Sequence, residues 1–381
     1  MELEPLPFRS ALIDYQGQAE ALLAGHRAGA AWAVEILRRC HPRFLDPEVP
    51  WLPQRLEDGA IERADLGPDD ARLALARWYD FQDWPALAEL VEAVAREEST
   101  VFPFESAVEA VVSGDLAALE GWLRRRPGLV RERSTRRTPF DPAVHAATLL
   151  HYIGANGVEG RRQRTPANAV AVARALLEAG AEVDALAGFY GSPCTTMSLL
   201  ASSCHPAQAG VQVELIETLL DFGAAVDGVG ETRWKSPLLS ALTFGYADAA
   251  EALARRGARV DQLAAAAGLG RIDAAVRLLG DADAEERRCA LALAAQLGQA
   301  EVLRLLLDAG EDPNLYNPEG FHAHSTPLHQ AALAGRGTVV TLLLERGARL
   351  DIRDKIYRGT PLDWALHAGQ SEIADLLRAQ A

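Results

Sequence analysis

The amino-acid sequence predicts an all-α fold in which about eight helix pairs form a solenoid, some with short β-hairpins, after a small helical domain. The first observation is a ten-residue frame that recurs from residue 105 onward, most clearly at residues 326–335. The second is a Leu-Leu-x-x-Gly-Ala run that follows most copies, as at residues 176–184. A single helix pair cannot bury its apolar surface alone, so stacking against neighbours is expected. These observations predict a helical N-terminal domain at 1–100 and a repeat array at 101–381.

The residues of the frame explain why it forms a helix. The hydroxyl of Thr326 can cap the helix, and Pro327 occupies the first turn, where its missing N–H costs nothing. Gly335 suits the left-handed conformation that ends a helix. The small apolar face that results lets neighbouring helices approach closely. It consists of Leu328, Ala331 and Ala332.

The frame has a family resemblance. A period in the low thirties with a Thr-Pro-Leu-His start, present at residues 326–329, is typical of ankyrin repeats. The chain resembles ankyrin-repeat proteins over roughly three quarters of its length. Residues 71–91 resemble a helical extension found before the repeats of some bacterial ankyrin proteins. The resemblance implies that exposed loops and first helices line a concave face that binds a protein. Copies of the frame start at residues 105, 148, 195, 236, 261, 289, 326 and 360.

The spacing of these copies is irregular, and it predicts where loops lie. Two long intervals contain insertions, at residues 158–167 and 205–210. The two shortest intervals, which start at residues 236 and 261, leave no room for a β-hairpin between repeats. Hairpin loops, called fingers below, are expected elsewhere. Their predicted positions are 185–195, 228–236, 315–326 and 352–360.

Residues 1–100 lack the frame and read as a separate helical segment. Several prolines between residues 42 and 53 predict an extended connector after the second helix. The aromatic turn at 78–85 is expected to close a small core. Helices are predicted at residues 18–28, 31–40, 69–79 and 85–96.

Composition excludes several classes of protein. A net charge of −15 disfavours a dedicated nucleic-acid binder, because phosphate neutralisation dominates such affinity. The excess of Arg over Lys and the Ala content favour a bacterial origin. Four scattered cysteines indicate a reduced, cytoplasmic chain. The sequence contains neither a signal-peptide pattern nor an apolar run long enough for a membrane helix, so no membrane association is expected.

The predicted fingers supply the main candidates for binding a protein. Aromatic residues and Arg are enriched among residues that dominate binding energy, and exposed loops commonly carry recognition. The alternative is that these aromatics fold back and cover the space between fingers. The candidate partner-binding residues are Phe189, Tyr190, Arg233, Trp234, Lys235, Tyr316, Phe321, His322, His324, Tyr357 and Arg358.

Arginines form a second feature. Seven lie within residues 124–137, and Arg161, Arg162 and Arg164 follow in the next repeat. Their guanidinium groups suit carboxylates and phosphates. One interpretation is that residues 1–100, which carry a net charge of −9, dock on residues 124–137 within the same chain. A run of charges can also be only a solvated face. The other is that Arg161, Arg162 and Arg164 bind an external anion.

No named enzyme motif is present. The Lys235-Ser236 pair follows Trp234 where a phosphate loop needs Gly. We therefore expect a non-catalytic protein–protein interaction role, with no cofactor and no metal. Two weaker alternatives stay open. One is a metal site at His322, His324 and His329. The other is a small-molecule or enzymatic pocket within residues 145–210, formed by His145, His151, Tyr152, Asn156, Glu159, Cys194, Thr195, Thr196, Cys204 and His205.

A regulatory role is a third possibility for the N-terminal segment. Its acidic helices would cover the array until a partner displaces them.

Overall fold

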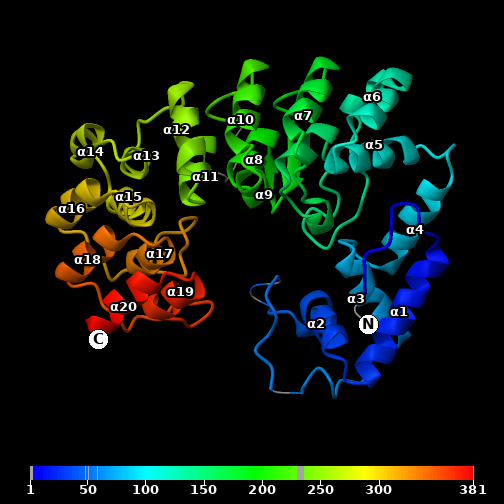
Figure 1. Cartoon of the computed structure of the whole chain (residues 1–381), viewed down its shortest axis with the longest axis horizontal. Coiled ribbons are helices and arrows are strands. Elements are labelled where there is room, and N and C mark those ends of the chain that lie inside the picture. Colours follow the sequence, from blue (N-terminus) through cyan, green and yellow to red (C-terminus); the bar gives the residue numbers. More distant parts are fainter. Residues whose placement is uncertain (1–2, 48, 50, 58, 230–235, 381) are drawn as a thin grey trace. The chain divides into compact units, whose positions relative to one another are not determined.

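The computed structural model describes residues 3–47, 49, 51–57, 59–229 and 236–380 (Figure 1). Its elements are mostly helices, as predicted. The chain divides into two compact units. The first consists of the described residues up to Ala224, and the second of Ala225–Val229 with the described residues from 236 onward. The boundary predicted at residue 100 does not coincide with this division and stays a prediction.

The first unit begins with helices that share one apolar core. The predicted helix at 31–40 is confirmed as α2, whereas α1 starts six residues before the predicted position. The earlier start has a local cause, because the Asp14 carboxylate accepts a hydrogen bond from the backbone N–H of Ala11 at 3.0 Å. Leu22, Leu75 and Leu87 are fully buried. The elements are α1 (Leu12–Arg27), α2 (Ala31–Cys40), η1 (Pro42–Phe44), α3 (Pro68–Trp78) and α4 (Trp84–Ala95).

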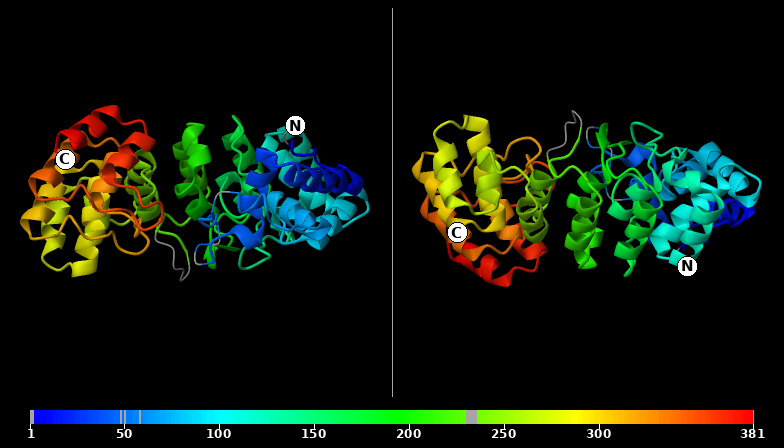
Figure 2. Two further views of the ribbon diagram at one scale, coloured as in Figure 1. Left: turned by 90° about the horizontal axis from the view of Figure 1, so that it is seen from below. Right: turned by 90° about the horizontal axis from the view of Figure 1, so that it is seen from above.

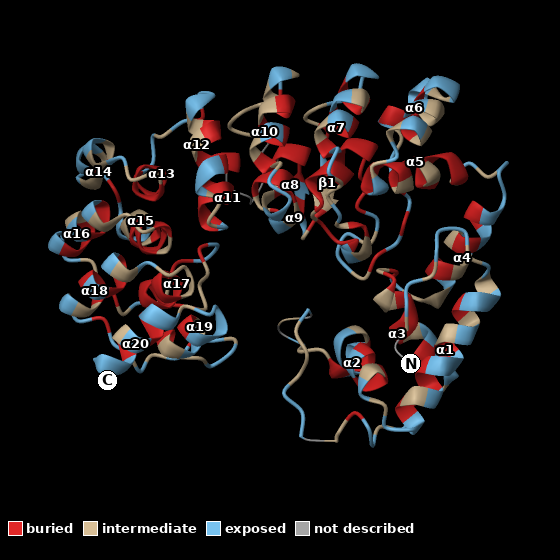
Figure 3. Cartoon of the chain, in the orientation of Figure 1, coloured by how far each residue is buried: buried red, intermediate tan, exposed pale blue. Residues whose placement is uncertain are grey.

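The rest of the first unit forms two rows of helices. Helices α5, η3 and α8 pack side by side in one row, and α6, α7 and α10 in the other. Figure 3 shows that buried residues concentrate in the first of these rows. The elements are α5 (Phe102–Ser113), α6 (Leu116–Arg125), η2 (Pro127–Arg131), η3 (Leu149–Gly154), η4 (Gly160–Arg162), α7 (Ala169–Glu178), β1 (Ala187–Phe189), β2 (Ser192–Cys194), α8 (Thr196–Ala201), α9 (Cys204–Gln208) and α10 (Gln212–Asp221).

The second unit repeats the same plan with shorter connections. Its first helices pack in the order α11, α13, α15, α17 and α19, and from α14 onward the second helices form a parallel row (Figures 1 and 2). Close approach is visible at Gly268 of α13, where an added Cβ would lie 2.9 Å from Leu242 of α11. The elements are α11 (Pro237–Thr243), α12 (Ala247–Arg255), α13 (Leu263–Gly268), α14 (Ile272–Leu279), α15 (Ala284–Leu297), α16 (Ala300–Asp308), α17 (Pro327–Leu333), α18 (Gly337–Glu345), α19 (Pro361–His367) and α20 (Ser371–Ala379).

Two frame histidines, His151 and His329, each link a helix cap to the following loop. In the second unit, His329 Nδ1 lies 2.8 Å from Thr326 Oγ1, and its Nε2 lies 3.2 Å from the carbonyl oxygen of Gly359. In the first unit, His151 Nδ1 lies 2.9 Å from Thr148 Oγ1. Its Nε2 lies 3.3 Å from the carbonyl oxygen of Cys194. The imidazole therefore fixes the distance between one repeat and the next.

The fingers differ from the prediction. The hairpin expected at 185–195 is present as β1 and β2, with Ala187 opposite Cys194. The hairpins expected at 315–326 and 352–360 are wrong, since the described residues there form turns and no strand. Pro318 has no N–H for a ladder, and the Asp354 carboxylate accepts the N–H groups of Ile356, Tyr357 and Gly359. Most of the finger expected at 228–236 lies outside the described residues.

The two short intervals behave as the spacing predicts. Helix α12 ends at Arg255 and α13 begins at Leu263, while α14 ends at Leu279 and α15 begins at Ala284. The described connectors between them contain no strand. In the part of the chain that the structure describes, no helix combines the length and the apolar character needed to cross a bilayer.

Candidate functional site

Five aromatic rings form a continuous strip on the second unit, here called the ring strip. The ring centroids of Phe244 and His322 are 6.3 Å apart, and those of His322 and His324 are 6.1 Å apart. His324 continues to Tyr357 at 6.4 Å and to Trp364 at 5.6 Å. The strip thus connects the end of α11 with the loops 315–326 and 352–360 and with α19.

Backbone contacts hold the middle of the ring strip in place. His322 has a left-handed backbone conformation (φ 63°), and its Nε2 lies 2.8 Å from the carbonyl oxygen of Thr243. The N–H of Lys355 donates to the carbonyl oxygen of His324 at 2.8 Å, which joins the two loops. Burial lowers the pKa of His324. The imidazoles are therefore fixed parts of the surface.

Asp354 holds the loop at 352–360 and positions Trp364. Its Oδ2 accepts the indole N–H of Trp364 at 3.1 Å and the N–H of Gly359 at 2.7 Å. Burial raises the pKa of Asp354, but these donors together with the N–H of Tyr357 outweigh burial and bring the pKa below its usual value. The carboxylate thus replaces the strand ladder that the finger was expected to have.

The ends of the ring strip are open to solvent. Phe244 is 48% exposed and Tyr357 is 64% exposed, and Leu366 on the neighbouring α19 is 49% exposed. Isolated exposed apolar side chains are common, but rings in continuous contact across several repeats are a feature of interaction surfaces. Arg358 is exposed beside Tyr357.

Two predicted contact residues belong to the core instead. Phe189 is 4% exposed and stacks on His145 with centroids 5.1 Å apart. Phe321 is 8% exposed. Both rings fold back under their loops, so the predicted surface role is wrong for them. The alternative of a hydrophobic cover applies to these two residues.

The other predicted contact residues have mixed positions. Tyr316 is half-buried; its OH donates to the carbonyl oxygen of Arg353 at 2.7 Å, and the Lys355 ammonium lies 4.3 Å from its ring centroid. Tyr190 is half-buried as well, and burial raises its pKa to about 12. Arg233, Trp234 and Lys235 lie outside the described residues.

A second assembly lies inside the first unit and is here called the buried ion cluster. It contains Glu105, Arg136, Glu159 and Arg162, with His145 and Tyr152 bonded to it. Arg162 contacts Glu105 at 2.5 Å and Glu159 at 3.0 Å, and a third carboxylate, that of Glu109, lies 3.3 Å away. The Arg162 side chain is only 7% exposed. Its predicted role as an external anion site is therefore wrong, because internal carboxylates already surround it.

The electrostatics of the buried ion cluster follow from its charges. Burial alone would raise the pKa of Glu159, but the guanidinium groups of Arg136 and Arg162 outweigh burial and hold that pKa well below its usual value. His145 Nε2 lies 2.6 Å from Glu159 Oε1, and the OH of Tyr152 donates to the same oxygen at 2.8 Å. Burial also raises the pKa of Tyr152 well above its ordinary value. Glu159 thus acts as the common acceptor of the cluster.

The pocket predicted within residues 145–210 is almost completely filled next to the His145–Glu159 pair. The cavity between His145, Tyr152, Glu159 and Phe189 has a volume of about 10 Å³, which accommodates at most one water molecule. His151, a further predicted member, is fully buried, and burial lowers its pKa to about 4. The His145–Glu159 pair has the right distance for proton transfer but no space for a substrate.

Other arginines contact the N-terminal helices. The Arg161 guanidinium lies 3.4 Å from the ring centroid of Trp78, and its Nε donates to the Trp78 carbonyl oxygen at 2.5 Å. Arg136 lies 3.9 Å from the ring centroid of Phe81. Arg137 pairs with Glu89 of α4 at 2.7 Å. The earlier arginines of the run pair locally instead, as Arg124 with Glu120 and Arg126 with Glu132 show.

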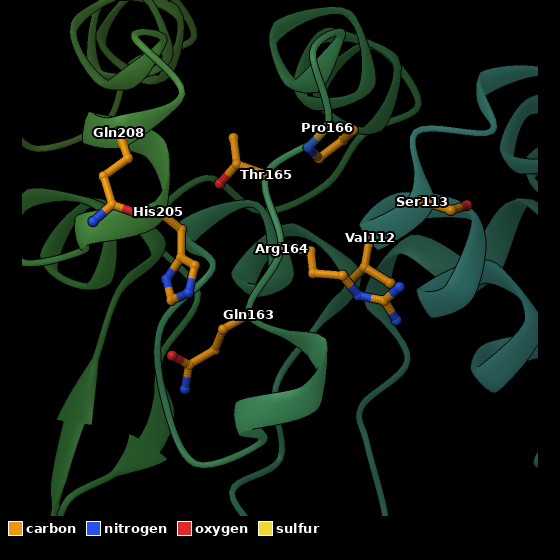
Figure 4. A pocket seen from close by; sticks show the side chains of 8 residues that line it. All are labelled: Val112, Ser113, Gln163, Arg164, Thr165, Pro166, His205 and Gln208. Carbon is orange, nitrogen blue, oxygen red and sulfur yellow. The ribbon is translucent and has the colours of Figure 1, made fainter. Parts of the chain in front are cut away.

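An open groove lies on the same unit, here called the α5–α9 groove. Its volume is about 580 Å³ (Figure 4). Arg164 and His205 were candidates from the sequence, and the groove brings them together. The remaining lining residues were missed, although most of them lie within the two predicted insertions. They are Val112, Ser113, Gln163, Thr165, Pro166 and Gln208.

Among the described residues, no group of three or more His, Cys, Asp and Glu side chains is placed to hold a metal ion. His329, one of the three histidines of the predicted metal site, is hydrogen-bonded to Thr326 and to the Gly359 carbonyl oxygen. No two of the four cysteines, all of which lie among the described residues, form a disulfide.

Comparison with known proteins identifies the repeats of the second unit. Residues 291–381 match the family model of ankyrin repeats, in three copies. This range covers α15 to α20 apart from the start of α15 and includes two of the loops that carry the ring strip. The chain therefore contains ankyrin repeats. The number of repeats before residue 291 stays a prediction.

Similar proteins cover parts of the chain. The human cyclin-dependent kinase inhibitor 2A is 39% identical over 85 residues, which are 22% of this chain and 52% of that protein. The mouse inactive serine/threonine-protein kinase TEX14 is 35% identical over 97 residues, 26% of this chain and 6% of that protein. The ankyrin repeat and KH domain-containing protein mask-1 of Caenorhabditis elegans is 27% identical over 214 residues, 54% of this chain and 8% of that protein.

This chain thus spans about half of one relative and a small fraction of the other two. All three relatives are eukaryotic, so they give no support to the bacterial type predicted from the sequence.

Proposed function

We propose that this chain is a non-catalytic interaction module whose second unit binds a protein partner through the ring strip. The observation that carries the proposal is the strip itself, in which ring centroids from the end of α11 and from the loops 315–326 and 352–360 follow one another at 6.1–6.4 Å while Phe244 and Tyr357 remain exposed at its ends. Aromatic side chains give large contact area at low cost in conformational entropy. Tyr316 and Arg358 lie beside the strip in sequence and extend the proposed surface.

Rigidity supports the same proposal. The bonds from His322 to Thr243, from Lys355 to His324 and from Trp364 to Asp354 fix the rings before a partner arrives. A surface that is already ordered loses less side-chain freedom on association. The strip also falls largely within residues 291–381, where the ankyrin repeats are found.

The relatives are consistent with a binding role. By its name, the human relative inhibits a cyclin-dependent kinase, and the mouse relative is an inactive kinase. For this chain we propose only that it binds a protein, in the cytoplasm. The partner is left to experiment.

We further propose that the helix pairs from residue 105 onward are ankyrin-type repeats and that residues 1–100 are an accessory domain. The matching bonds of His151 and His329 support the first part. The contacts of Arg136, Arg137 and Arg161 with α3, α4 and the turn between them support docking of the accessory domain on the first repeats.

A small-molecule or enzymatic role at the His145–Glu159 pair gains no support from a cavity of about 10 Å³.

The test is quantitative capture of partners from an extract of the source organism. The bait is the full chain, and the variant combines Phe244→Ala with Tyr357→Ala. The matched control is Val276→Ala on α14, which removes a side chain that is 56% exposed and lies outside the strip.

We expect at least one protein to be captured equally by the wild type and the control and depleted about tenfold or more by the double variant. Circular dichroism should show the same thermal unfolding for all three baits. Equal capture by all of them would refute a role for the ring strip.

A further inference from the structure

The α5–α9 groove has three walls from separate segments of the first unit. The end of α5 contributes Val112 and Ser113, the connector 163–166 runs through the middle, and α9 contributes His205 and Gln208 (Figure 4). Figure 4 shows Arg164 on the side of α5 and His205 on the side of α9. Because the groove is open to solvent, it covers one side of a ligand and leaves the other side free.

The charge of the groove is opposite to that of the chain. The whole sequence has 53 acidic and 38 basic residues, yet the described lining residues include Arg164 and His205 and no Asp or Glu. The Arg164 side chain is exposed, and among the described residues no carboxylate lies within ion-pair distance of it. Arg162, two residues earlier, has three such carboxylates. The groove therefore offers an uncompensated guanidinium.

Neutral hydrogen-bonding groups surround this cation. The Gln163 side chain is oriented by its amide N–H, which donates to the Gly157 carbonyl oxygen at 2.8 Å. Gln208 is exposed on α9. The Thr165 hydroxyl oxygen is buried and has no hydrogen-bond partner within the described part of the chain. Because that oxygen is inaccessible to solvent, the neutral groups available to a ligand include the side-chain amides of Gln163 and Gln208.

The walls of the groove are held by internal bonds. The connector begins directly after Arg162, which the buried ion cluster fixes. The amide of Asn168 donates to the Gly114 carbonyl oxygen at 2.8 Å, which ties the end of the connector to the end of α5. On the other side, the Gln212 amide donates to the Ser203 carbonyl oxygen at 3.3 Å, just before α9. The groove is thus formed before any ligand binds.

We propose that the α5–α9 groove binds an acidic peptide segment of a protein partner. An Asp or Glu carboxylate of the peptide pairs with the Arg164 guanidinium, which suits bidentate recognition of carboxylates. The side-chain amides of Gln163 and Gln208 bond polar groups of the peptide next to that carboxylate. A peptide fits better than a small molecule, because small-ligand sites enclose most of the ligand surface and this groove is open.

This inference goes beyond the ring strip, since it concerns the other unit and fixes the charge of what binds there. The experiment measures fluorescence anisotropy of a labelled peptide with four consecutive Glu residues, added to the full-length chain. A peptide of the same length with Gln in place of Glu is the neutral probe. Unlabelled free glutamate and inorganic phosphate serve as competitors.

The variant is Arg164→Gln, and the matched control is Arg174→Gln. Arg174 is an exposed arginine on α7 that does not line the groove, so both changes remove one positive charge. We expect the wild type and Arg174→Gln to bind the Glu peptide equally, and Arg164→Gln to bind it about tenfold more weakly. The Gln peptide should bind the wild type no more tightly than the Glu peptide binds Arg164→Gln.

Several outcomes would overturn the proposal. They are no binding of the Glu peptide by the wild type, equal binding by Arg164→Gln, or free glutamate and phosphate binding as tightly as the peptide. The last result would assign the groove to small anions. The Phe244→Ala, Tyr357→Ala double variant should keep its affinity for the Glu peptide, which separates failure of this proposal from failure of the ring strip.

Discussion

The repeats that begin at Thr148 and Thr326 have the same cap but differ in the type of helix after it and in the residues around that helix. In both, a histidine three residues after the threonine bonds the threonine hydroxyl and the next loop. After Thr326 the chain forms the α-helix α17 in apolar surroundings. After Thr148 it forms the 3-10 helix η3, beside the buried ion cluster.

The difference shows how an insertion changes a repeat. Residues 158–167 bring Glu159 and Arg162 into the interior of the first unit, whereas α17 packs in a cluster of apolar side chains. Buried charges need partners, and Glu105 and Arg136 supply them from other parts of the chain. The cap sets the distance between repeats, while the residues after the cap decide what kind of interior the repeat has.

The largest expected effect is on the buried ion cluster. Glu159→Ala leaves Arg136 and Arg162 without their shared carboxylate, and we expect it to lower the free energy of unfolding of the first unit by about 3–5 kcal/mol. The control is Glu120→Ala, which removes an exposed pair with Arg124 and should cost about 1 kcal/mol or less. Urea denaturation followed by circular dichroism measures both. Similar losses for the two variants would contradict a structural role for the cluster.

The matching test in the second unit concerns its apolar interior. Phe321→Ala removes a ring that is 8% exposed, and we expect a loss of about 3–4 kcal/mol, typical of a buried Phe. Tyr316→Ala, in the same loop but half-buried, is the control and should cost less. Thermal unfolding of the two variants gives the comparison. If Phe321→Ala lost less stability than Tyr316→Ala, the Phe321 ring would be exposed and not part of the core.

A third test uses pH. Burial lowers the pKa of His151 to about 4. In the unfolded chain a histidine has a pKa of about 6.5. The unfolded state therefore binds more protons between these values, so this contribution is complete above about pH 6.5 and is lost as the pH falls toward 4. We expect a loss of about 2–3 kcal/mol from this group over that range. Urea denaturation at a series of pH values should show a steeper decline for the wild type than for His151→Asn. If the free energy of unfolding fell equally with pH in the wild type and in His151→Asn, the proposed contribution of His151 would be contradicted.

The smallest effect on stability is expected at the ring strip. Tyr357 is 64% exposed, so Tyr357→Ala should change the free energy of unfolding by about 0.5 kcal/mol or less. Its effect should appear in partner binding instead. Thermal unfolding in parallel with capture of the partner distinguishes the two. A loss of stability as large as that of Phe321→Ala would mean that Tyr357 belongs to the core.

Helices and their caps were predictable from neighbouring residues, whereas two of the hairpins and the long-range contacts were not. The capping role of Thr326 and the helix α2 follow from neighbouring residues. One of the partners of Arg162, Glu105, is 57 residues away in the sequence, so a run of arginines gave no sign that one of them is buried. Likewise, Phe189 and Tyr357 look alike as loop aromatics, and only the packing of His145 against Phe189 separates core from surface.

The most direct test of the ring strip as a binding surface is site-specific photocrosslinking. A benzophenone amino acid replaces Tyr357 in the full chain, and the same residue replaces Val276 on α14 as the control. After irradiation in an extract of the source organism, we expect a covalent adduct with a single protein at position 357 and none with that protein at 276. Adducts at position 276 alone, or at neither position, would contradict the account.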